Sequence, residues 1–166
     1  MASKKGIAVT ITILVVITVA SFSLWMIPEN NETTFVVSDF KGYLDGVKNI
    51  QEVLQESTYI EFQSLRDEKI STEEYITITE ITSSQITAQI SEFVTSKPPE
   101  EWQSSYISYM EAMKKFNEYI GETKVLANLI EKGSTEAEMV ETLEKIESLK
   151  IEYVEYVKIS DESRPD

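Results

Sequence analysis

The residue pattern between positions 102 and 130 constrains the fold more than any other feature of this sequence. Apolar and aromatic side chains recur there at alternating intervals of four and three residues, the spacing of the contact seam in helical bundles and coiled coils. Thr123 is the only polar member of the stripe. We therefore expect one long helix with a buried face. The stripe consists of Trp102, Tyr106, Tyr109, Met113, Phe116, Ile120, Thr123, Ala127 and Ile130.

Three further segments repeat this period, and each predicts another helix of a bundle. The second of them is the least regular, because residues 75–79 are β-branched and alternate in a way that locally favours a strand. Helical spacing nevertheless continues to Phe93, and no partner strand is evident, so we predict a helix. The stripes are Phe40, Tyr43, Val47, Ile50, Leu54, Ser57 and Glu61; Tyr75, Ile78, Thr82, Ile86, Ile90 and Phe93; and Met139, Leu143, Ile146, Tyr153 and Val157.

Helix-capping residues mark the boundaries of these four segments. Ser38 precedes the first helix as a cap, and Ser71 and Thr135 each begin a capping box. Pro99 opens the third helix and Gly133 ends it. Together they predict an all-α protein with an antiparallel up-down-up-down four-helix bundle, or alternatively a dimer of two long hairpins. The expected helices span residues 38–69, 71–96, 99–132 and 135–159.

A charge-free run of 21 residues, IAVTITILVVITVASFSLWMI at 7–27, precedes the bundle. It is long enough to cross a bilayer as a helix, and the two lysines before it predict a cytoplasmic N-terminus. We therefore expect an uncleaved signal anchor. The predicted organisation is a basic cytoplasmic tip at 1–6, a transmembrane helix at 7–27, a linker at 28–37, an extracytoplasmic bundle at 38–160 and a polar tail at 161–166.

Two alternatives for the N-terminal segment involve processing. Ser21 and Ser23 place small residues at the −3 and −1 positions of a secretory cleavage site, which would release the bundle. Residues 4–10, KKGIAVT, resemble the class III signal of archaeal pilin-like proteins. That resemblance implies cleavage after Gly6 and assembly of the apolar helix into a filament. Pro28 departs from the pattern, because it would interrupt a continuous helical spine.

The composition excludes most kinds of active site. The chain has no His and no Cys, so it lacks the residues for Ser-His-Asp or Cys-His catalysis, Cys/His zinc sites and disulfides. Its formal net charge is -14, which disfavours nucleic acid as a partner. The glutamates between 138 and 155 fall mainly on the polar side of the last helix, the pattern of a solvated face. We expect a non-enzymatic protein without a cofactor or a metal site.

Two groups of side chains come together when the predicted helices are aligned antiparallel. One is an aromatic group in the membrane-proximal half, which predicts a packed core or, alternatively, a pocket for a small apolar or cationic ligand. The other is a polar layer in the distal half, whose buried members would fix helix register or bind a ligand. Glu61 stands out, because an unpaired buried carboxyl has a raised pKa. The aromatic candidates are Tyr43, Phe93, Trp102, Tyr106, Tyr109 and Tyr153, and the polar candidates are Ser57, Glu61, Thr82 and Thr123.

These observations predict a single-pass membrane protein with its N-terminus in the cytoplasm and its C-terminus outside. Its plan is similar to the external sensor module of helical-bundle chemoreceptors, which implies protein association, cell-surface architecture or ligand sensing. The expected partners are the lipid bilayer, through residues 7–27, and a membrane or cell-surface protein or a second copy of the chain. The alternative is a secreted or pilin-like structural subunit processed at its N-terminus.

Overall fold

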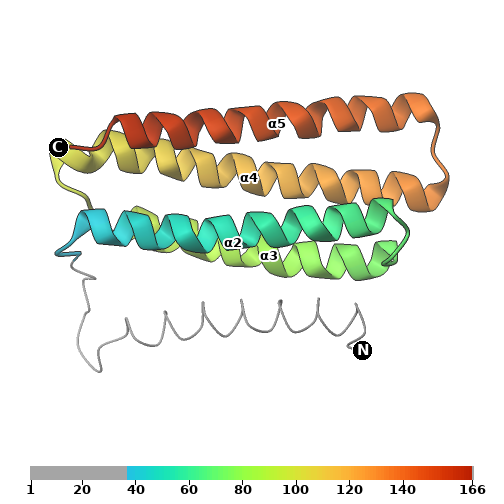
Figure 1. The fold of residues 1–166 in the computed structure, drawn as a ribbon, viewed down its shortest axis with the longest axis horizontal. Coiled ribbons are helices and arrows are strands. Elements are labelled where there is room, and N and C mark those ends of the chain that lie inside the picture. Colours follow the sequence, from blue (N-terminus) through green and yellow to red (C-terminus); the bar gives the residue numbers. More distant parts are fainter. Residues whose placement is uncertain (1–36, 166) are drawn as a thin grey trace, which may run out of the picture.

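The structure, a computed structural model, describes residues 37–165, and helices make up nearly all of this part (Figure 1). α2 spans Phe40–Arg66, α3 spans Thr72–Thr95, α4 spans Glu100–Lys132 and α5 spans Glu136–Glu162. No strand occurs in the described part, so the all-α prediction is confirmed, including the helix at the β-branched residues 75–79. The expected cytoplasmic tip, the transmembrane helix and all but the last residue of the linker lie outside the described residues.

Consecutive helices run in opposite directions, which is the predicted up-down-up-down order (Figure 1). α2 begins, α3 ends, α4 begins and α5 ends at one end of the bundle, here called the proximal end. The turns that join α2 to α3 and α4 to α5 lie at the opposite, distal end, where the α4–α5 hairpin projects further. None of the four described helices combines the length and the apolar content needed to cross a bilayer.

Side-chain caps fix where most of the helices begin. Asp39 caps α2, because its Oδ1 accepts a hydrogen bond from the backbone N–H of Gly42 at 2.8 Å. The prediction that Ser38 caps this helix is wrong, since Ser38 lies one residue further from the first turn and Asp39 takes the position. Ser71 caps α3 as predicted, because its hydroxyl accepts a hydrogen bond from the backbone N–H of Glu74, but the return bond of the predicted capping box is not formed there. Thr135 caps α5 with a complete capping box, as predicted.

The helix ends differ from the predicted ones by a few residues. Gly133 ends α4 in the left-handed conformation with φ 65°, as its residue type indicates. Pro99 lies just before α4 rather than inside it. α2 stops at Arg66, earlier than predicted, because Glu68 adopts a φ of 55°, which an α-helix does not accommodate. α5 continues to Glu162, beyond the predicted end at 159.

The buried faces of α2 and α3 are displaced by one residue at alternate positions of the predicted stripes. Both faces keep the spacing of three and four residues, and they share Val47, Leu54 and Glu61 with the prediction in α2. At several positions the apolar pattern predicts the wrong one of two adjacent residues, because the residue that is actually buried there is polar. The structure buries Leu44, Gln51 and Thr58 in α2 and Thr79 and Gln89 in α3, in place of the expected Tyr43, Ile50, Ser57, Ile78 and Ile90.

α4 is the central helix and packs against both α3 and α5. Its predicted stripe is buried at every position from Tyr106 to Ala127. Trp102 is half-buried, and Ile130, near the projecting end of α4, is 40% exposed. A second buried stripe, repeating every seven residues, has no counterpart in the sequence-based prediction. It consists of Ser105, Ala112, Tyr119 and Leu126.

α5 buries less apolar surface than its predicted stripe indicates. Ile146 and Leu149 are buried, but Leu143 is 37% exposed and Tyr153 is half-buried. The cause is that α4 supplies most of the contacts of α5. The seam between α2 and α5 is therefore the least closely packed side of the bundle.

Candidate functional site

Five of the six aromatic candidates form one cluster near the proximal end, here called the aromatic cluster. Phe93 and Tyr106 stack with their ring centroids 4.5 Å apart and 11° between the ring planes. Tyr43 stacks against both rings, with centroid distances of 5.9 and 6.4 Å. Trp102 meets Tyr106, and Tyr109 meets Phe93, edge to face at 6.2 and 6.0 Å.

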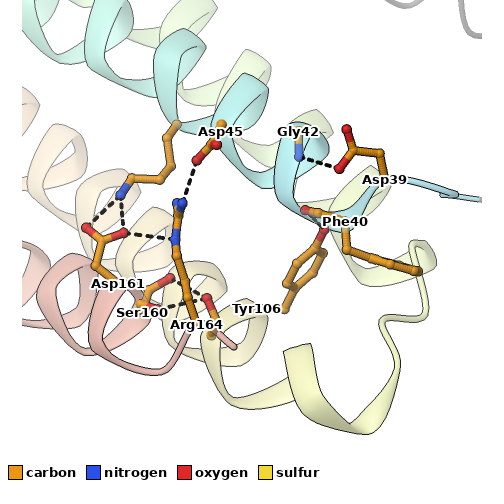
Figure 2. Close-up of polar contacts among 10 residues, drawn as sticks. Asp39, Phe40, Gly42, Asp45, Tyr106, Ser160, Asp161 and Arg164 are labelled. Carbon is orange, nitrogen blue, oxygen red and sulfur yellow. Dashed lines mark hydrogen bonds and ion pairs between the residues drawn. The ribbon is translucent and has the colours of Figure 1, made fainter. Parts of the chain in front are cut away.

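The aromatic cluster fills its own space and behaves as core rather than as a pocket. Phe93 and Tyr106 are each 3% exposed and Tyr109 is 1% exposed. The Tyr106 hydroxyl donates a hydrogen bond to the carbonyl oxygen of Phe40 at 2.7 Å, which joins α4 to the first turn of α2 (Figure 2). Desolvation raises the pKa of Tyr106 and Tyr109 far above the ordinary value for tyrosine, so both phenols stay neutral.

Ion pairs close the seam between α2 and α5 at the proximal end (Figure 2). Lys48 Nζ lies 2.6 Å from Asp161 Oδ1, and Arg164 Nη1 lies 2.6 Å from Asp45 Oδ1. Arg164 Nε also lies 3.2 Å from Asp161 Oδ1. We call these four residues the proximal latch. Partly exposed pairs contribute about 0.2–1 kcal/mol each, so the latch orients the two helices more than it stabilises them.

The polar layer predicted in the distal half is buried at three of its four positions. Glu61, Thr82 and Thr123 are 5%, 7% and 0% exposed, whereas Ser57 is half-buried and Thr58 takes the inward position. The hydroxyls of Thr58, Thr82 and Thr123 each donate to a carbonyl oxygen of their own helix, three or four residues earlier. These donors are therefore satisfied without a ligand.

Glu61 is the ionisable member of this layer. Burial raises its pKa above the ordinary value, and the negative charge of Glu74 raises it further. The fully buried Tyr75 hydroxyl has no hydrogen-bond partner of acceptable geometry in the described part. Desolvation raises its pKa well above the ordinary value, and the nearby Thr123 hydroxyl offsets only part of this rise. Within residues 37–165, no group of three or more carboxylates is arranged to hold a metal ion. Glu61, with Glu74 as a nearby second acid, fits a role in helix register better than one in metal binding.

A groove of about 440 Å³ opens between α2 and α5, with α4 as its floor. Phe116 and Tyr119 of α4 stack there at 5.7 Å, and the Tyr153 ring of α5 lies 5.6 Å from Phe116. Tyr59 of α2 stands at the rim, 55% exposed. Desolvation raises the pKa of Tyr119 and Tyr153 to about 12, so the phenols of the floor are neutral near pH 7. This α2/α5 groove follows the same seam as the proximal latch, further toward the distal end.

The rim of the α2/α5 groove carries charges of both signs. Glu52 and Glu56 lie one helical turn apart on α2, so their carboxylates project from the same face. Lys150 faces them from α5, and its nearest ion-pair partner is Glu147 at 3.9 Å. The groove therefore joins an apolar, aromatic floor to an acidic wall and one opposing cation.

Only one of the ten candidate residues lines this groove. Tyr153 does so, and its ring contacts Phe116 rather than a ring of the aromatic cluster. Tyr59 and Tyr119 lie outside the predicted stripes and were not identified as site residues. For Tyr119 a signal was present, because the spacing of seven that relates it to Ala112 and Leu126 marks a second buried face of α4.

Two buried glutamines are also missing from the sequence-based prediction. Gln51 is 0% exposed and Gln89 is 7% exposed. Neither side-chain amide has a hydrogen-bond partner within the described residues. An apolar stripe carries no signal for such residues, because their polarity argues against burial.

The α2/α5 groove combines a concave shape, neutral aromatic rings and a charged rim, which are the usual features of a site for a small molecule. A fold by itself does not define a function, so any further assignment needs either a related protein or the chemistry of the site. Comparison of the chain with protein-family models, with curated proteins and with solved structures found no match.

Proposed function

We propose that this protein is a single-pass membrane protein that holds a non-enzymatic helical bundle outside the cytoplasm and binds a ligand in the α2/α5 groove. The observation that carries the proposal is the groove, because concave sites lined mainly by apolar and aromatic side chains are where small molecules bind. Its presence favours ligand sensing over a purely architectural role. The lack of His and Cys in the chain supports binding rather than catalysis.

The proposed tether is supported by the sequence of residues 7–27 and by the orientation of the bundle. The run at 7–27 carries no charge, and two lysines precede it. A tether that leads into α2 would bring the proximal end of the bundle toward the membrane, since α2 begins there (Figure 1). The α2/α5 groove would then lie on the side of the bundle, open to the extracytoplasmic solvent.

Protease accessibility and intact mass test the tether. In intact cells, we expect the bundle to be digested by added protease and the full-length chain to be found in the membrane fraction. Loss of residues 1–6 from the mature chain would instead support the pilin-like alternative. Loss of residues 1–23 would support a secreted bundle. Either mass contradicts the uncleaved anchor.

Photo-crosslinking in native membranes tests the groove. A crosslinking amino acid at Val154, which is 56% exposed at the groove, is compared with one at Val125, which is 45% exposed on the distal part of α4 outside the groove. The two positions match in residue type and are similarly exposed, so they differ mainly in location. We expect an adduct from Val154 and none from Val125. Adducts from both positions, or from neither, contradict binding in the groove.

A further inference from the structure

We infer that the α2/α5 groove binds an organic cation with an apolar body, such as an arylalkylamine. This inference rests on the proposed function and adds the chemical class of the ligand. The geometry points to it because neutral aromatic rings and carboxylates occur together at one opening of the bundle, and each group attracts a different part of such a molecule.

The aromatic floor suits both the apolar body and the positive charge. Phe116, Tyr119 and Tyr153 form a continuous group of rings, with neighbouring centroids less than 6 Å apart, and Tyr59 adds a ring at the rim. The faces of such rings carry negative electrostatic potential and attract ammonium groups within about 6 Å. A volume of about 440 Å³ accommodates an aromatic amine.

The acidic wall supplies the second element of recognition. Glu52 and Glu56 project from one face of α2, and neither forms an ion pair within the described residues. Residues 37–165 carry 13 basic and 26 acidic side chains, so the surrounding field also attracts cations. An anionic ligand would meet this field and both carboxylates on the same wall.

The same seam already holds an ammonium group in this kind of environment. Lys48 Nζ lies 5.9 Å from the centroid of the Tyr109 ring and 2.6 Å from Asp161 Oδ1. Lys48 precedes Glu52 by about one helical turn on α2. The protein thus uses a tyrosine ring and a carboxylate together to hold a cation next to the groove, and the groove offers the same two kinds of group.

Lys150 is the residue whose charge distinguishes between a cationic and an anionic ligand. It faces Glu52 and Glu56 across the groove, and its side chain is 55% exposed with its nearest ion-pair contact at 3.9 Å. A bound cation is repelled by Lys150, whereas a bound anion depends on it. Removal of this one charge must therefore change the affinities for cations and anions in opposite directions.

The experiment measures binding of three matched probes to the full-length chain in lipid nanodiscs by isothermal titration calorimetry. Phenethylammonium is the cation, 3-phenylpropionate is the anion and 3-phenylpropan-1-ol is the neutral probe. All three carry one phenyl ring on a short chain, so differences among them report charge. We expect the cation to bind most tightly and the anion least.

Three variants sharpen the result. The double variant Glu52→Gln/Glu56→Gln is expected to weaken phenethylammonium binding by about 3- to 10-fold, and Lys150→Gln to strengthen it by about 2- to 5-fold. Glu131→Gln, an exposed substitution near the distal end of α4, is the control and leaves the affinity unchanged. Binding of the neutral probe should not respond to any of them. Circular dichroism of each variant verifies that the bundle remains folded.

Three results would overturn the inference: tighter binding of the anion than of the cation, weaker cation binding in Lys150→Gln, or no cation binding up to about 10 mM. These failures are distinguishable from failure of the proposed function. If Val154 still gives its specific adduct, the groove binds a ligand of another class. If the chain is absent from the membrane fraction, the proposed tether is wrong. The affinities of the three probes still test the ligand class, because they do not depend on the tether.

Discussion

Replacement of Gln51 by Met is expected to stabilise the bundle by about 1–3 kcal/mol. Gln51 is fully buried, and neither its Oε1 nor its Nε2 has a hydrogen-bond partner in the described part of the chain. A buried polar group without a partner costs about 1–3 kcal/mol of desolvation. Met has a similar unbranched shape and a similar helix propensity, so the substitution removes this cost without opening a cavity.

The effect is measured as a change in the unfolding midpoint of residues 29–166, a fragment that must first give a predominantly helical circular dichroism spectrum. For a domain of this size about 1 kcal/mol corresponds to about 4 °C, so we expect Tm to rise by about 4–12 °C. Urea unfolding at fixed pH and salt gives the free energy directly. Gln103→Met, an exposed substitution on α4, is the control and should change stability by less than about 0.5 kcal/mol.

Gln89 provides the comparison that refutes or supports this reasoning. Gln89→Met is expected to stabilise by a similar amount, and the two gains should add if each amide is unsatisfied independently. A loss of about 1 kcal/mol or more in Gln51→Met would refute the argument, because it would mean that the amide is hydrogen-bonded in the folded protein, for instance to buried water. A coupling energy above about 0.5 kcal/mol in the double variant would show instead that the two amides do not act independently.

Three other substitutions test the ionisable and aromatic contacts by urea unfolding. The raised pKa of Glu61 means that its ionisation costs stability as pH rises through the folded pKa, so Glu61→Gln should be more stable than the unsubstituted protein at pH 7 and lose that advantage below the ordinary pKa of glutamate. If the free energies of unfolding of Glu61→Gln and the unsubstituted protein changed with pH in parallel, this expectation would be contradicted. Asp161→Asn removes the negative charge shared by both cations of the proximal latch and should cost about 0.5–2 kcal/mol, less at high salt, whereas the control Glu162→Gln should cost under about 0.5 kcal/mol. Tyr106→Phe removes the hydrogen bond to the Phe40 carbonyl and should cost about 1 kcal/mol, and an unchanged midpoint would show that this bond contributes nothing.

The helices and their order follow from the sequence because caps and apolar spacing act locally. Ser71, Gly133 and Thr135 mark their boundaries by side-chain and backbone chemistry that does not depend on distant contacts. The long α4 stripe is equally local, since seven consecutive inward positions are apolar or small. The exact inward positions of α2 and α3 required the structure, because Gln51 and Gln89 are polar where the pattern demands an apolar residue.

The groove, in contrast, depends on how far two helices stand apart. α2 and α5 are the first and last helices of the bundle, and no local pattern reports their separation. The distance of a residue from the bundle ends predicts the level of Tyr153 along the bundle, but it does not show which side of α5 the side chain occupies. Tyr59 was missed because an exposed aromatic residue on a helix gives no signal until a neighbouring surface is known.

The proximal latch has a consequence for the order in which this chain matures. Each of α2, α3 and α4 meets a neighbour that is close in sequence, so each of the two hairpins can form before the rest of the bundle is available. Asp45 and Lys48, however, wait for Asp161 and Arg164, which emerge more than a hundred residues later. The seam that borders the groove is therefore the last part of the bundle to close. A chain interrupted before residue 161 would contain three helices and most of the fourth, but it would lack the ion pairs that join α2 to α5 at the proximal end of the groove.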